Sequence, residues 1–552
     1  MRKRFLIPCL IILFASCNNK EQVDMVILAA KVYTADSQFN EYEAIAINEG
    51  KIVAVGDKSS IANKYSSDST IDASGSFVYP GFIDAHCHFS GYALSSYRLD
   101  LVGTKSYEEV LAKLVEYDKT NTLNWIYGRG WDQNDWEIKE FPDKAALDSL
   151  YPDKLVILKR VDGHAVLCNQ KALDMAGITL NTVIHGGIIE KKNGKLTGIL
   201  IDNAAEPVEN IIPALPPLAE AIKYLQAAEK ECFSLGLTSV VDCGVKADVI
   251  TVLKQLYEQH KLSIGNSILL AQDESTLDAY AAKGFYKREQ FQINGIKLYA
   301  DGALGSRGAC LLEPYTDMPG HLGMLLSDIS KMREIAALAK AHNLQLCTHA
   351  IGDSANRAIL RLYSEFLPEN NDLRWRIEHA QVVDYQDYAW FSKYKIIPSV
   401  QPTHAISDMP WAGERLGGER LPTAYAYKKL LGQNGWIALG TDFPVEAINP
   451  LATFYTAVAR KDKDGHPENG FLPENKLSRK EALMGMTAWA AKSVFWEKEK
   501  GSLEPGKDAD IIILDKDIME IPEKELPNVN IIFTIVKGKT VYKKRELNNS
   551  SR

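Results

Sequence analysis

The chain has 552 residues, too many for one small domain, and 46% of them are hydrophobic and 24% charged, as in ordinary soluble globular proteins. Its formal net charge of -8 comes from mixed residues without a long block of one sign. The composition therefore gives no support for nucleic acid as a partner, and it allows a large buried core.

The N-terminal segment differs from the rest of the chain. Basic residues at positions 2–4 precede the apolar run Phe5 to Ala15, which is too short to span a bilayer as a stable helix, so residues 1–16 are predicted to be a signal peptide. The run Leu-Phe-Ala-Ser-Cys resembles a bacterial lipoprotein processing site, with Cys17 as the lipidated residue and residues 17–24 as a tether. Phe14 departs from the usual aliphatic residue and leaves cleavage by an ordinary signal peptidase as the alternative. We expect an exported protein that contacts the membrane of the cell envelope only through this lipid.

Export to an oxidising compartment would permit disulfides. The cysteines beyond the leader are scattered through apolar runs without Cys-x-x-Cys spacing: Cys87, Cys168, Cys232, Cys243, Cys310 and Cys347. This pattern is typical of buried free thiols.

Short strands are predicted at both ends of the chain. Asn48-Glu49-Gly50 is a hairpin turn within the first set, and a second set lies between residues 510 and 542. Neither set has enough strands for a good core alone. We therefore expect one small β-sandwich assembled from residues 25–79 and 485–545.

The segment Val78 to His88 carries the first candidate metal ligands. An apolar run ends in His86 and His88, and in a strand the period of two places both imidazoles on the same face. Two adjacent imidazoles form half a metal site, whereas the alternative is a pair of ordinary loop histidines. Further ligands downstream decide between these interpretations.

Four later apolar runs supply them. Lys297 lies inside one run, where a solvated cation is poorly tolerated, and the other three end in His349, His379 and Asp442. Polar residues at the carboxyl ends of successive strands are typical of a (β/α)8 barrel, which keeps its chemistry there.

The spacing of these residues tests the barrel. A barrel of about 250 residues has about 31 residues in each βα unit. His349 and His379 are one such unit apart and Asp442 follows after two, which assigns them to strands five, six and eight, with Lys297 on strand four. The interval from His88 to Lys297 is far longer than three units. We therefore predict a barrel over residues 80–484 with an insertion at about 91–202.

The insertion has two interpretations. It could be a lid over the strand ends that shapes a substrate pocket, or a solvated structural addition. Trp131 and Trp136 favour the second, because large aromatic side chains are usually core residues.

At these positions the chain resembles the metal-dependent amidohydrolase superfamily, and within it the YtcJ-like branch (amidohydrolase family 3) that includes N-substituted formamide deformylases. The order and number of the matching stretches carry the resemblance. These are Gly-Phe-Ile-Asp-Ala-His-Cys-His (81–88), Gly-Arg-Gly-Trp-Asp (128–132), Asp-Gly-His (162–164), Asp-Gly-Ala-Leu-Gly-Ser-Arg-Gly-Ala (301–309), His-Ala-Ile-Gly-Asp (349–353), Glu-His-Ala-Gln (378–381), Gln-Pro-Thr-His (401–404) and Gly-Thr-Asp-Phe-Pro-Val-Glu (440–446). The resemblance implies an α/β fold, a TIM-like barrel with a composite β-sandwich, and it favours the lid because Asp-Gly-His matches a pocket motif of the family.

The resemblance also implies a chemistry. A metal-activated water would hydrolyse a C–N bond other than an ordinary peptide bond, in a linear or cyclic amide or an N-substituted formamide. His86 and His88 would bind the more buried ion, and His349 and His379 the more exposed one. Imidazole suits Zn²⁺, but Mn²⁺ or Fe²⁺ accept the same ligands, and the choice between one ion and two stays open.

Two further residues have assigned roles and alternatives. In matching superfamily members the lysine of strand four reacts with CO2, so Lys297 would form a carbamate that bridges both metals; its alternative is a core lysine paired with a carboxylate such as Asp301. Asp442 would be a metal ligand and the general base that takes the water's proton and gives it to the leaving group. Its alternative is a helix N-cap.

His164, Arg307 and His404 are assigned to binding of a small-molecule substrate, with a structural role as the alternative. A homodimer is left open. Two other functions remain: an esterase or lactonase that uses the same site, and a ligand-binding lipoprotein without turnover. The complete ligand set argues against the last, because a decayed site would have lost members.

Overall fold

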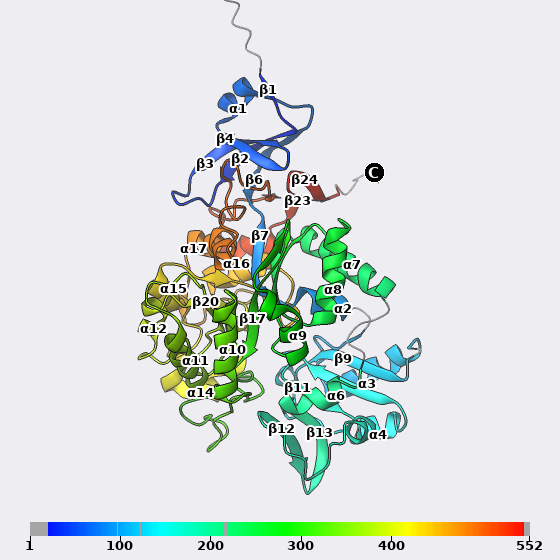
Figure 1. Cartoon of the computed structure of the whole chain (residues 1–552). Coiled ribbons are helices and arrows are strands. Elements are labelled where there is room, and N and C mark those ends of the chain that lie inside the picture. Colours follow the sequence, from blue (N-terminus) through cyan, green and yellow to red (C-terminus); the bar gives the residue numbers. More distant parts are fainter. Residues whose placement is uncertain (1–19, 96–97, 122, 213–217, 546–552) are drawn as a thin grey trace, which may run out of the picture.

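The computed structural model describes residues 20–95, 98–121, 123–212 and 218–545, so the predicted signal peptide and the predicted lipidation site Cys17 lie outside the described residues. The described strands form three main parts (Figure 1). They are a barrel, a sheet inserted in the chain between the first and second barrel strands, and a sheet made from both chain ends. No helix within the described ranges is long and apolar enough to cross a bilayer.

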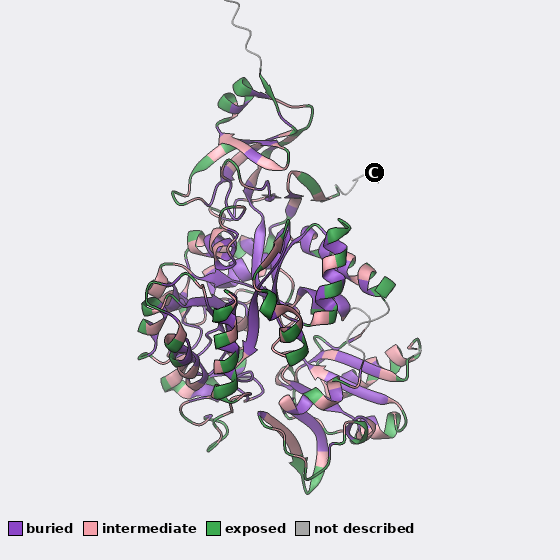
Figure 2. Ribbon diagram, viewed as in Figure 1, coloured by how far each residue is buried: buried purple, intermediate pink, exposed green. Residues whose placement is uncertain are grey.

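Eight parallel strands form the barrel sheet, and their order in space follows the chain. They are β7 (Phe82–Cys87), β14 (Leu237–Val245), β15 (Gly265–Leu270), β17 (Phe291–Tyr299), β18 (Gln345–Ala350), β19 (Arg376–His379), β20 (Ile397–Val400) and β21 (Ala438–Leu439). Almost all their residues are buried, as expected for parallel strands covered on both faces (Figure 2). The amide of Asp442 donates to the His86 carbonyl, and that of His88 to the Phe443 carbonyl, both at 2.8 Å, which joins the last strand to the first.

The predicted (β/α)8 barrel is confirmed. Lys297, His349 and His379 lie on its fourth, fifth and sixth strands, and Asp442 follows the eighth, as the spacing indicated. Helices cover the outside of the barrel, each with one buried face (Figure 2). They include α7 (Leu218–Ser234), α8 (Ala247–Glu258), α9 (Glu274–Tyr280), α10 (Ile329–Ala341), α11 (Asp353–Phe366), α12 (Tyr388–Lys393), α14 (Met409–Arg420), α15 (Tyr427–Asn434), α16 (Pro450–Ala459), α17 (Arg479–Gly485) and α18 (Ala488–Ser493).

Both ends of the chain contribute to a second sheet. Its order is β24 (Lys539–Lys543), β23 (Ile531–Val536), β22 (Ile511–Leu514), β6 (Thr70–Pro80), β2 (Met25–Tyr33), β3 (Glu41–Asn48) and β4 (Lys51–Gly56). The predicted hairpin turn is confirmed, since Glu49 and Gly50 join β3 to β4 with φ values of 50° and 75°. The sequence predicted a small β-sandwich assembled from both chain ends, and strands from both ends do pair here. Strand β6 pairs with β2 on one side and β22 on the other, so hydrogen bonds connect all seven strands. Strands β1 (Glu21–Gln22) and β5 (Tyr65–Ser66) form a separate short pair.

Strand β6 continues across Gly81 directly into β7, which carries His86. A Cβ at Gly81 would lie 2.3 Å from Cγ2 and Oγ1 of the buried Thr238, at the start of β14. Glycine therefore permits the close approach of the first two barrel strands at the point where the composite sheet joins the barrel.

The insertion is a six-stranded sheet with its own core on each face. Its order is β12 (Gly187–Lys192), β13 (Lys195–Asp202), β11 (Ala165–Cys168), β10 (Leu155–Arg160), β9 (Trp125–Trp131) and β8 (Leu99–Asp100), with α3 (Tyr107–Asp118), α4 (Ala145–Leu150) and α5 (Gln170–Met175). It starts after α2 (Phe89–Leu94), which packs against the barrel. Trp131 and Trp136 belong to one of the cores, as their size indicated.

The cysteines also follow the sequence-based prediction. The six cysteines of the described part are free, and all but the partly exposed Cys310 are buried.

Candidate active site and metal centre

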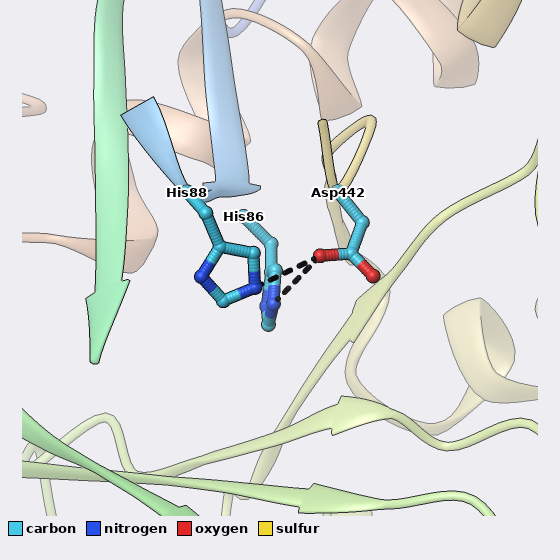
Figure 3. A group of neighbouring side chains, drawn as sticks. All are labelled: His86, His88 and Asp442. Atoms are coloured by element: carbon cyan, nitrogen blue, oxygen red, sulfur yellow. Dashed lines mark ion pairs between the residues drawn. The ribbon is translucent and has the colours of Figure 1, made fainter. Parts of the chain in front are cut away.

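The carboxyl end of the barrel brings imidazole and carboxylate groups together. Nε2 of His86 and Nε2 of His88 lie 3.4 and 3.3 Å from Oδ1 of Asp442 (Figure 3). His86, His88 and Asp442 offer ligand atoms within 4.8 Å of one another, and so do His379, His404 and Asp442. The two groups share Asp442, which makes this carboxylate the centre of the site.

His86 is oriented by a buried ion pair on β19. Its Nδ1 lies 2.5 Å from Oε2 of Glu378, whose other oxygen accepts from Nε of Arg376 at 2.6 Å. Burial alone would raise the pKa of Glu378, but Arg376 and His86 outweigh it and hold that pKa far below its usual range. Burial lowers the pKa of His86 to about 4. The neutral imidazole therefore has its Nδ1 directed to a carboxylate and its Nε2 lone pair facing the site, the arrangement typical of a metal-binding histidine.

The other three predicted histidines have one nitrogen engaged in the same way. Nδ1 of His88 donates to the Cys243 carbonyl at 3.0 Å, and Nδ1 of His379 lies 2.8 Å from Oε1 of Gln401. Nε2 of His349 donates to a backbone carbonyl at 3.4 Å. Burial lowers the pKa of His349 and of His379 well below the ordinary value, so each ring is neutral and has a nitrogen available for a metal.

His349 is outside the two compact groups of ligand atoms but adjoins them. Its ring centroid lies 4.6 Å from that of His379, which in turn lies 4.9 Å from that of His86. The structure thus brings together all four histidines that the sequence selected.

Lys297 is buried on β17 and points at this centre. Its Nζ lies 3.2 Å from Nε2 of His86 and 4.8 Å from the centroid of the Tyr299 ring. None of the ion pairs found among the described residues includes Lys297. Asp301 instead accepts the amides of Cys310, Ile351 and Gly352 at 2.8 to 3.0 Å. The alternative that pairs Lys297 with Asp301 is therefore wrong.

Asp442 has two differently engaged oxygens. Oδ2 lies 3.1 Å from Nε2 of His404, whose Nδ1 lies 3.2 Å from Oε1 of Glu446, while the buried Oδ1 has no hydrogen-bond partner. Burial alone would raise the pKa of Asp442, but the surrounding imidazoles outweigh it and keep the group ionised. The helix N-cap alternative is wrong, because the next helix, α16, begins at Pro450 and is capped by Asn449.

A cavity of about 1150 Å³ opens onto these groups and is lined by both the barrel and the insertion. The barrel contributes His88, Lys297, Tyr299, His349, His379 and Asp442, and the insertion contributes Arg129, Lys159, Arg160, Asp162, Gly163 and His164. This shared lining supports the interpretation of the insertion as a lid.

A sequence model described as an amidohydrolase family matches residues 69–542. The chain belongs to the amidohydrolase family. It is 33% identical to the amidohydrolase-family protein YtcJ of Bacillus subtilis (strain 168) over 529 residues, which is 93% of this chain and 98% of the relative. It is 26% identical to the N-substituted formamide deformylase of Arthrobacter pascens over 548 residues, which is 94% of this chain and 98% of that enzyme.

A solved structure agrees with this assignment. The metal-dependent hydrolase of Pyrococcus horikoshii OT3 superposes with a TM-score of 0.74 at 28% identity, covering 90% of this chain and 99% of the other. The family resemblance stated from the motifs is confirmed, and the metal-dependent character of amidohydrolases agrees with the ligand groups found here.

The structure separates the three residues assigned to substrate binding in this amidohydrolase. His164 lines the cavity, with Nδ1 2.8 Å from Oδ1 of Asp202, and His404 lines it as well. Arg307 is not among the lining residues, and its guanidinium pairs with Asp317 at 2.8 Å. The structure therefore gives no support to a substrate contact by Arg307.

Sequence reasoning missed several residues that hold the centre in place: Asp84, Glu378, Gln401 and Glu446. Asp84 accepts the amide of Thr441 at 3.0 Å and its hydroxyl at 2.7 Å, and so links the first strand to the end of the eighth. Burial raises the pKa of Asp84 to about 7. Its position two residues before His86, on the same strand face, is a signal that could have pointed to it.

Proposed function

We propose that this amidohydrolase is a metal-dependent enzyme that hydrolyses a C–N bond in an N-substituted amide or formamide, linear or cyclic. The observation that carries the proposal is the gathering of the four histidines around Asp442, whose buried Oδ1 has no hydrogen-bond partner, beside a cavity large enough for a small molecule. The similarity to a formamide deformylase along 94% of the chain supports the bond type.

The donor set fits a divalent ion. Imidazole nitrogens and a carboxylate oxygen suit Zn²⁺, and also Mn²⁺ or Fe²⁺. His86 and His88 would hold one ion, and His349 and His379 a second, with Asp442 and a carbamate of Lys297 as the anionic ligands. When bound, such an ion lowers the pKa of a water and polarises a carbonyl.

The chain's own residues supply the remaining steps. Oδ1 of Asp442 takes a proton from the attacking water and passes it to the leaving nitrogen. His404 donates to Oδ2 of the same carboxylate and is itself held by Glu446, so the base stays oriented. Burial alone would lower the pKa of His404, but Asp442 and Glu446 outweigh it and keep the ring protonated as that donor. The insertion covers the site, and His164 faces the substrate from it.

A single set of measurements tests the proposal. Purified protein is analysed for bound metals, stripped with a chelator, reloaded, and assayed against N-substituted formamides, acylated amines, dipeptides and lactones. We expect metal-dependent release of amines from formamides or amides. Turnover of lactones or esters alone would favour the esterase or lactonase, and tight ligand binding without any turnover would favour the binding lipoprotein.

A further inference from the structure

The cavity is lined by several cationic side chains, and most have partners. The Arg160 guanidinium forms ion pairs with Asp132 and Asp162, and the Lys159 ammonium lies 2.8 Å from a carboxylate oxygen of Glu209. The protein itself thus balances these charges, as buried charges require.

Arg129 is different. Its Nη2 donates to the Val161 carbonyl at 3.0 Å, and its Nε is buried without a hydrogen-bond partner. Among the ion pairs formed by the described residues, none includes Arg129. Burial lowers the pKa of this guanidinium below its ordinary value. A partly desolvated arginine without an anion is costly unless another molecule supplies one.

Arg129 lies close to the metal centre. It is on β9, next to Lys159 of β10 in the sheet register. A Cβ on Gly163 would lie 3.6 Å from both Nη2 of Arg129 and Cε of Lys159, so this glycine packs against both cations. The next residue, His164, has its ring centroid 5.1 Å from that of His349. One turn of the insertion therefore separates the guanidinium from the ligand groups.

Three nearby carboxylates pair with other cations. Asp132 and Asp162 pair with Arg160, and Glu209 pairs with Lys159. The guanidinium has a planar fork of donors whose geometry matches a carboxylate in two parallel hydrogen bonds. The anion that Arg129 lacks would therefore come from a molecule in the cavity.

We propose that Arg129 binds a carboxylate of the substrate, which makes the substrate class amides with a carboxylate close to the scissile C–N bond, such as N-formyl or N-acyl amino acids. That the scissile bond is a C–N bond rests on the proposed function. That the substrate has a carboxylate rests on Arg129 alone, so an experiment can contradict either claim without the other.

A matched pair of substrates tests the specificity. Racemic N-formylphenylalanine and N-formyl-2-phenylethylamine differ only in the carboxylate. We expect the metal-loaded wild type to favour the first by about 10- to 100-fold in kcat/KM, as charge-assisted hydrogen bonds allow. Arg129→Gln should bring this ratio close to one, mainly through KM. Arg333→Gln is the matched control, because Arg333 lies on the surface and pairs with Glu365, and it should keep the wild-type ratio.

A binding measurement separates the two proposals. 3-Phenylpropionate has the carboxylate and ring but no scissile bond, and calorimetric titration should show binding to the metal-loaded wild type at least tenfold tighter than to Arg129→Gln. If neither formamide is hydrolysed while this difference holds, C–N hydrolysis fails and carboxylate recognition stands. If both formamides are hydrolysed equally well, or Arg129→Gln keeps the wild-type ratio, carboxylate recognition fails. Should Arg129→Gln not fold, Arg129→Lys keeps the charge without the fork, and a ratio equal to that of the wild type would contradict the proposal.

Discussion

At the candidate metal centre, Asp442 presents a buried oxygen to two imidazole nitrogens at 3.3 and 3.4 Å, and this oxygen has no hydrogen-bond partner. Its other oxygen is held by His404. A buried carboxylate oxygen without a hydrogen-bond partner is suited to accept a proton or to bind a metal ion. One carboxylate can take these two roles at different steps of a reaction. Its backbone φ of 63° is rare for a residue with a side chain, and the hydrogen bond that its backbone N–H donates to the His86 carbonyl stabilises that conformation.

Replacing Asp442 with Asn tests its role as the base. Asn has nearly the same shape and can still accept from His404, so the fold should be retained. It cannot take a proton, so kcat should fall by about 10² to 10⁴, as is typical when a general base is lost. Metal content should fall less, because four histidines and Lys297 remain. Melting temperature, metal content and kcat are measured on the same preparation; near-normal kcat in a folded, loaded variant would place the base elsewhere.

Lys297 can be compared with a second buried lysine of the same chain. Lys500 lies 2.9 Å from Asp510, whereas Lys297 has no such carboxylate partner. Lys500→Met should leave Asp510 as an unpaired buried charge and destabilise the protein by about 3–5 kcal/mol. Lys297→Met should leave the metal-free protein at least as stable as the metal-free wild type, while metal content and activity fall together.

Denaturant titration of the metal-free proteins measures their stability. Metal analysis and assays of the metal-loaded proteins measure metal content and activity. A Lys297→Met variant with full metal content and wild-type turnover would refute the bridging role of this lysine.

The sequence predicted that His349, His379 and Asp442 lie together because each ends an apolar run at barrel spacing. It did not predict Glu378, whose partner His86 is 292 positions away, or Glu446, which acts through His404. Contacts between distant strands leave no local pattern, so such orienting residues emerge only when the barrel closes.

At the scale of elements, the insertion shows what spacing can and cannot reveal. The surplus of residues between His88 and Lys297 located the insertion. Its six-stranded sheet with a core on each face could not be predicted, because spacing does not reveal the order in which the strands pair. The composite sheet was likewise predicted from both chain ends, whereas its single-sheet connectivity depends on β6 pairing on both edges.

The passage from β6 into β7 can be tested with two glycines of the same segment. A Cβ at Gly81 would meet Cγ2 and Oγ1 of Thr238 at 2.3 Å and its Cβ at 2.8 Å, so a rotation of the threonine cannot relieve the clash. Gly81→Ala should therefore destabilise the protein by about 1–3 kcal/mol through overpacking and should also weaken metal binding, because His86 follows on the same strand. Gly75→Ala is the control, since nothing lies within 4 Å of its Cβ position. Equal denaturation midpoints for the two variants would contradict this account.

At the scale of the whole molecule, the composite sheet and the cavity lie apart. Figure 1 shows β1 at one end of the molecule, the insertion strands β12 and β13 at the other, and the barrel between them. The cavity is lined by the barrel and the insertion. An anchor attached ahead of β1 would therefore hold the protein by the end opposite the candidate active site.

This arrangement leads to a prediction about Cys17. We expect the mature protein to begin at Cys17 and to carry lipid on it, because the basic and apolar leader ends at this residue. Cys17→Ser should abolish labelling with a fatty acid and move the protein from the membrane to the soluble fraction. Its kcat/KM should stay within about twofold of the wild type, because anchoring and catalysis use opposite ends of the fold. Mass spectrometry of the mature N-terminus decides between the two processing routes: an unmodified first residue other than Cys17 would mean cleavage by an ordinary signal peptidase and a protein without an anchor.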